Sequence, residues 1–109
     1  MALCHDGMRE NMIKREPVKN SDQVKVTFVV PHDPAQGAIY VVGDFNDWDT
    51  TANRLIRRSN NTRSVALRLP TGQRFAFRYY SEDGQWFNEP DADATEPNEY
   101  GSVNSILLT

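Results

Sequence analysis

Short apolar runs with a two-residue period, separated by turn residues, are the feature that most constrains how this chain folds. In the run 24–30 every second residue is apolar, and the runs 64–69 and 74–80 repeat the pattern. Clusters of Pro, Gly, Asn and Asp follow the runs, including the hairpin signal Asp83-Gly84. Alternation of this kind places the apolar side chains on one face of a strand. The sequence therefore predicts an all-β, immunoglobulin-like (early set) sandwich of about seven to eight short antiparallel strands.

The same reading divides the chain into two parts. Residues 1–22 mix charged, amide and Met side chains and contain Pro17, which predicts a flexible N-terminal leader. Residues 23–109 are predicted to form the sandwich module, and the acidic stretch 90–98 is expected to be an irregular loop within it. The expected strands cover residues 24–30, 38–42, 64–69, 74–80, 86–88 and 102–108, with a weaker strand at 54–57.

Charge and cysteine content restrict the function classes. The chain of 109 residues carries a net charge of -3, whereas nucleic-acid modules usually carry a basic excess. Five arginines lie between residues 54 and 68, but their acidic neighbours favour a solvated strand face. Cys4 is the single cysteine, and no apolar run has the length of a membrane span or signal peptide. We expect a cytoplasmic protein that binds neither nucleic acid nor membrane.

Catalytic and metal sites are not predicted. The many Asp and Glu residues lie in expected turns, and His5 and His32 have no Ser or Cys partner in a triad context. The sequence Asp44-x-Asn46 begins like a calcium loop, but Trp48 and Asp49 occupy positions that such a loop gives to a ligand and to Gly. We therefore expect no catalytic residue, no metal and no cofactor.

Two tryptophans are the candidate functional residues. Trp48 follows an apolar run and Gly43 in a short polar loop, whereas Trp86 follows the turn that returns beside Arg78 and Tyr80. Indole rings beside a guanidinium and amides suit a sugar, because a pyranose has an apolar C–H face and a rim of hydroxyls. The alternative is that both indoles are core residues with satisfied N–H groups. The residues alone leave both readings open.

Five segments of the chain resemble carbohydrate-binding module family 48, also called the isoamylase N-terminal domain. They are residues 40–48, 67–72, 75–80, 83–90 and 98–105, which follow in family order from about residue 23 to the end. The family occurs in glycogen branching and debranching enzymes and in the β subunits of AMP-activated protein kinase. The resemblance implies a non-catalytic module for α-1,4-glucans such as glycogen, starch or maltooligosaccharides.

The resemblance also implies a set of binding residues. Trp48 and Trp86 match the two stacking platforms, and Arg78 matches the basic residue, which is usually Lys in the family. Tyr100 matches the wedge before the late Gly, Ser102 the small hydroxyl and Asn104 the hydrogen-bonding amide. The chain departs from the pattern at Glu82, which lengthens the hairpin, and at Tyr100, which replaces an aliphatic residue. One alternative remains, a docking domain that recruits or packs on a glycogen branching or debranching enzyme without binding sugar. Such an enzyme is the second expected partner, beside the α-glucan itself.

Overall fold

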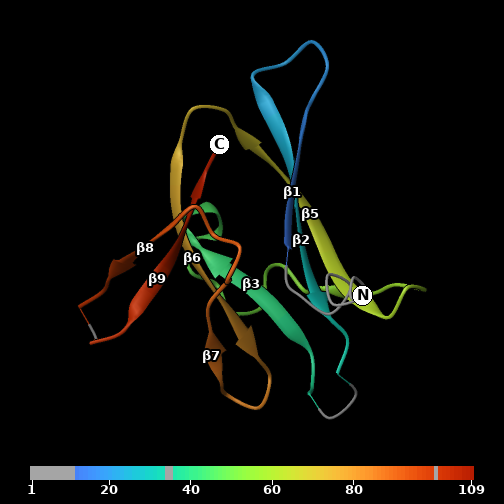
Figure 1. Cartoon of the computed structure of the whole chain (residues 1–109), viewed down its shortest axis with the longest axis vertical. Helices are drawn as coiled ribbons and strands as arrows, with labels where there is room; N and C mark the ends of the chain where they lie inside the picture. The colour runs from blue at the N-terminus through green and yellow to red at the C-terminus, as the bar shows by residue number, and fades with distance from the viewer. Residues whose placement is uncertain (1–11, 34–35, 100) are drawn as a thin grey trace, which may run out of the picture.

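The fold is a sandwich of two antiparallel sheets (Figure 1). The computed structural model describes residues 12–33, 36–99 and 101–109. One sheet has the order β1-β2-β5-β4, and the other has the order β3-β6-β9-β8 with β7 paired to β6. The strands are β1 (Met12–Pro17), β2 (Gln23–Pro31), β3 (Ile39–Gly43), β4 (Ile56–Arg57), β5 (Thr62–Pro70), β6 (Arg74–Ser81), β7 (Trp86–Phe87), β8 (Ala94–Pro97) and β9 (Val103–Leu108). The predicted all-β sandwich is confirmed.

The core forms where the alternating apolar faces of the two sheets meet. Val26 and Phe28 of β2 are fully buried, as are Phe77 and Tyr79 of β6. The Phe28 ring lies 5.3 Å from the Phe77 ring and 6.5 Å from the Tyr79 ring, both in edge-on geometry. Because side chains alternate along a strand, burial of Phe77 and Tyr79 turns Arg78 to the outer face of its sheet.

The structure differs from the predicted leader over Met12–Pro17, which forms β1 and pairs with β2. The Ile13 N–H donates to Asp91 Oδ2 at 3.0 Å, and the Arg15 guanidinium pairs with the Asp93 carboxylate. Both partners lie far along the chain, so local sequence carries little sign of this strand. Residues 1–11 lie outside the described residues, and the division of the chain after residue 22 stays a prediction.

The acidic stretch expected to be irregular contains strand β8. Its four residues pair with β9, and Glu96 lies opposite Asn104. Glu96 also forms an ion pair with Arg74 of β6. Pro97 ends the strand at the sheet edge, where the missing N–H removes no ladder hydrogen bond. The loop was predicted wrongly because β8 depends on pairing with β9, and this pairing brings residues 96–99 to the outer face of the sheet.

A buried carboxylate holds the segment that follows β7. Glu89 is 2% exposed; its Oε1 accepts the Tyr79 hydroxyl and its Oε2 accepts the Asp91 N–H at 2.9 Å. The Glu89 N–H donates to Ser105 Oγ at 2.9 Å. Burial, followed by the charge of Glu89, raises the pKa of Tyr79 well above its ordinary value. The network ties the end of the Trp86 segment to β6 and β9.

The mutation Tyr79→Phe should destabilise the protein by about 1.5–3 kcal/mol, because a charge-assisted hydrogen bond inside the core is lost. Tyr79 binds its proton more tightly when folded than when unfolded. Its contribution is therefore complete below a pH of about 10, the unfolded pKa, and is lost as pH rises above it. Urea unfolding of wild type and Tyr79→Phe from pH 7 to 11 measures both effects.

Tyr40→Phe is the matched control, since the described residues offer the Tyr40 hydroxyl no hydrogen bond and its ring is only partly buried. Equal unfolding free energies for the two variants across this pH range would contradict the role given to the Tyr79–Glu89 pair.

Candidate functional site

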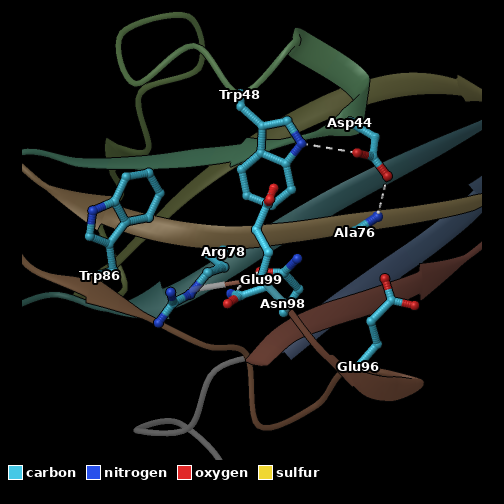
Figure 2. Close-up of a pocket in the computed structure, with 9 residues that line it drawn as sticks. Asp44, Trp48, Ala76, Arg78, Trp86, Glu96, Asn98 and Glu99 are labelled. Atoms are coloured by element: carbon cyan, nitrogen blue, oxygen red, sulfur yellow. Dashed lines mark hydrogen bonds between the residues drawn. The ribbon is translucent and has the colours of Figure 1, made fainter. Parts of the chain in front are cut away.

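A cleft of about 690 Å³ lies on the outer face of the sheet that contains β6 (Figure 2). Residues from the segment after β3, from β6, β7, β8 and β9, and from the β8–β9 turn converge on it. They are Asp44, Trp48, Ala76, Arg78, Trp86, Glu96, Asn98, Glu99 and Asn104. Both tryptophans therefore face the same hollow, which has the volume of a typical ligand site.

The backbone of the loop after β3 directs Trp48 into the cleft. The short 3-10 helix η2 (Asp44–Asn46) is followed by two residues with positive φ, Asp47 at 56° and Trp48 at 58°. Such φ values are uncommon for a bulky residue and persist only where neighbours enforce them. Here the Trp48 indole N–H donates to Asp44 Oδ1 at 3.0 Å, and Asp44 Oδ2 accepts the Ala76 N–H at 2.8 Å. Asp44 thus fixes the indole to β6.

Asn46 and Gly43 hold the base of this loop. Asn46 Oδ1 accepts the Gly43 N–H at 3.0 Å, and its Nδ2 donates to the Val41 carbonyl at 3.0 Å and to Asn53 Oδ1 at 2.7 Å. A Cβ on Gly43 would lie 2.4 Å from the Ala76 carbonyl oxygen, so the backbones of β3 and β6 approach closely only with Gly. The segment from Gly43 to Trp48 therefore holds the Trp48 indole in a fixed position.

Trp86 provides the second ring of the cleft. It is 41% exposed and lies opposite Tyr80 in the β6–β7 pairing, with ring centroids 4.7 Å apart. The Arg78 guanidinium carbon lies 5.8 Å from the Trp86 ring centroid, within cation–π range. Trp48 is partly buried, and neither indole belongs to the buried core. The alternative that both tryptophans are core residues is wrong.

The lengthened hairpin keeps Trp86 beside Arg78. Glu82 exchanges contacts with Ala38: its N–H donates to the Ala38 carbonyl at 2.9 Å, and its Oε1 accepts the Ala38 N–H at 3.0 Å. The extra residue therefore hydrogen-bonds to the segment before β3, and Tyr80 and Trp86 remain paired in regular register.

Arg78 lies on the floor of the cleft. Its Nε is buried, and the described residues offer it no hydrogen-bond acceptor. A buried N–H without an acceptor has a free-energy cost. Packing around the Arg78 side chain must offset this cost, because no hydrogen bond at Nε does so. The guanidinium donates hydrogen bonds only, which suits hydroxyl oxygens as well as anions.

An amide network orders the β8–β9 turn. Asn98 Nδ2 donates to Asn104 Oδ1 at 3.1 Å, and Asn98 Oδ1 accepts the Ser102 N–H at 3.2 Å. Because Asn104 Oδ1 already has this donor, its Nδ2 is the group that can donate to a ligand. Ser102 is not among the described residues that line the cleft, and the prediction for Tyr100 falls outside the described residues.

The structure thus brings together four of the six predicted residues, Trp48, Arg78, Trp86 and Asn104. Sequence reasoning missed Asp44, which the spacing of a carboxylate four residues before an indole could have suggested. It also missed Glu96, Asn98 and Glu99, which reach the cleft through the unpredicted strand β8 and the turn after it.

Other classes of site were sought across the described ranges. They contain no group of three or more His, Cys, Asp or Glu side chains arranged to hold a metal ion. Within the same ranges, no helix is long and apolar enough to cross a membrane. Arg63, from the arginine-rich stretch, is buried and donates to the carbonyls of Asp33, Gln36 and Gly37.

Comparison with known families places most of the chain in one family. A family model described as the glycogen recognition site of AMP-activated protein kinase matches residues 18–109. The chain belongs to this family. The predicted resemblance is confirmed, and this glycogen-recognition domain is of a carbohydrate-binding, non-catalytic kind. The match includes every segment that lines the cleft. A search of curated proteins gives no match.

Asp44→Asn should release the Trp48 ring of the glycogen-recognition domain. The indole and the Ala76 N–H each use a different carboxylate oxygen, and an amide would place an NH₂ donor against one of these two N–H groups. We expect a loss of about 1–3 kcal/mol in unfolding free energy and a red shift of Trp fluorescence. Asp47→Asn is the control, because it removes the same charge from an exposed left-handed residue that Asn tolerates. Identical fluorescence spectra and unfolding free energies for the two variants would contradict the role of Asp44 in holding the Trp48 ring.

Proposed function

We propose that the cleft binds α-1,4-linked glucan, such as glycogen, starch or maltooligosaccharide, by stacking glucose units on Trp48 and Trp86. The observation that carries this proposal is that both indoles, Arg78 and Asn104 line one cleft. The family of the chain, a glycogen-recognition domain, supports the same ligand class.

Stacking accounts for part of the binding. The apolar C–H face of a glucose ring covers an indole and releases water, and aromatic contacts of this type contribute about 0.5–1.5 kcal/mol beyond area burial. Trp86 has Arg78 and Tyr80 as support and retains an exposed surface. Trp48 is held by Asp44, so its ring needs little further ordering when a sugar arrives.

Hydrogen bonds account for recognition of the hydroxyl rim. Arg78 donates from its guanidinium, and Asn104 donates from Nδ2. The proposal also includes a hydrogen bond from the Ser102 hydroxyl and a wedge contact from Tyr100, as the family resemblance implies. With two stacked rings and a few hydrogen bonds, the dissociation constant should lie in the micromolar to millimolar range, on the order of -8 to -4 kcal/mol. A cytoplasmic location belongs to the proposal, since Cys4 is the single cysteine.

Titration with β-cyclodextrin and maltoheptaose tests the function, with Trp fluorescence and backbone amide shifts as readouts. We expect saturable binding with shifts confined to the lining residues. Trp86→Ala should weaken binding at least about tenfold, which corresponds to about 1.4 kcal/mol. Because Trp86 is largely outside the core, its removal should change the unfolding free energy by no more than about 1 kcal/mol.

Ile56→Ala is the matched control, since Ile56 is 48% exposed on β4 of the opposite sheet. It should bind both sugars like wild type. Absence of any response at millimolar sugar would contradict the proposal and favour the docking role. Unfolding of Trp86→Ala would show that Trp86 is needed for the fold.

A further inference from the structure

We propose that this cleft selects uncharged glucan and rejects glucan that carries anionic substituents such as phosphate esters, with Glu99 as the main selectivity residue. The inference rests on the proposed function and concerns which members of that ligand class are admitted. Its basis is the charge of the lining, which contains three carboxylates, Asp44, Glu96 and Glu99, and one guanidinium, Arg78.

The three carboxylates differ in how far their charges are compensated. Glu96 pairs with Arg74, whose side chain lies outside the lining. Asp44 accepts two hydrogen bonds from neutral groups, the Trp48 indole and the Ala76 N–H, and has no ion pair among the described residues. Glu99 is exposed and has no ion pair with any described residue. Glu99 therefore presents the least compensated negative charge to a ligand.

The charges are also unevenly placed along the cleft. In Figure 2 the Arg78 guanidinium lies below Trp86, whereas the Glu99 side chain extends toward the Trp48 ring, with Asp44 and Glu96 toward the opposite end from Trp86. The Trp86 end of the cleft is thus the cationic end, and the Trp48 end is the anionic one. A glucose unit stacked on Trp48 meets carboxylates, which accept hydrogen bonds from its hydroxyls.

A phosphate ester on that glucose unit would meet the same carboxylates as a like charge. Repulsion between like charges costs free energy and disfavours the wrong ligand, which is a common source of specificity. Arg78 could attract the phosphate, but it is a single cation at the other end of the cleft, against Asp44 and Glu99, the two lining carboxylates without an ion pair among the described residues. The balance therefore favours neutral chains.

The experiment compares three cyclodextrins by isothermal titration at low salt. They are β-cyclodextrin, its neutral hydroxypropyl derivative as a control for bulk, and phosphorylated β-cyclodextrin. We expect the phosphorylated ligand to bind at least about fivefold more weakly than the hydroxypropyl one. The ratio should fall in 0.5 M NaCl, where screening shortens the range of the charges.

Glu99→Gln should reduce this ratio by at least about half, because the ratio compares the hydroxypropyl and phosphorylated ligands on the same variant and so cancels any change in neutral-sugar affinity. Glu16→Gln is the matched control, because it makes the same change in net charge on β1 of the other sheet and should leave the ratio unchanged. The double variant Glu96→Gln with Glu99→Gln should reduce the ratio further.

The outcomes separate the inference from the function. Binding of neutral β-cyclodextrin together with equal binding of the phosphorylated and hydroxypropyl ligands would overturn the charge selectivity and leave the proposed function standing. A ratio that Glu16→Gln changes as much as Glu99→Gln would show that total charge acts instead of the cleft, and would also overturn it. Absence of binding to neutral β-cyclodextrin would overturn both proposals.

Discussion

Packing of Phe28 against Phe77 and Tyr79 is the contact on which the rest of this structure depends. It brings the two sheets together and sets which side chains of β6 face inward. A shift of β6 by one residue would exchange its two faces, so the buried rings also specify that Ala76 and Arg78 face the cleft. The packing of the core therefore also determines which residues, Ala76 and Arg78, form the floor of the cleft.

Strand β6 also holds the two indole-bearing segments in place. The Ala76 N–H binds Asp44, which orients Trp48, and the Tyr79 hydroxyl binds Glu89, which anchors the chain just after β7. Each tie is a carboxylate that accepts a hydrogen bond from β6. Because both hydrogen bonds end on the same strand, the sandwich itself positions the two rings relative to each other.

The sequence was most informative where local pattern and tertiary structure agree. Alternation in the run from Val24 to Val30 predicted the inward face of β2, and the residues around Gly43 predicted a loop that presents Trp48. The pattern could not reveal β1 or β8, because Ile13 and Glu96 acquire extended structure from partners about ten to eighty residues away. Exposure of Trp86 was equally undecidable, since an indole beside an apolar strand suits a core as well as a surface.

In this cleft the features that favour affinity differ from those that favour selectivity. The rings are already ordered by Asp44 and by the β6–β7 pairing, so under the proposed function most of the ordering cost of binding falls on the glucan. Few direct hydrogen-bond donors face the ligand, and stacking is tolerant of position along a repeating chain. Contacts of this kind distinguish poorly between one glucose unit and the next. Under the proposed selectivity, Glu96 and Glu99, which β8 and the turn after it bring to the cleft, discriminate between chemically different chains by their charge.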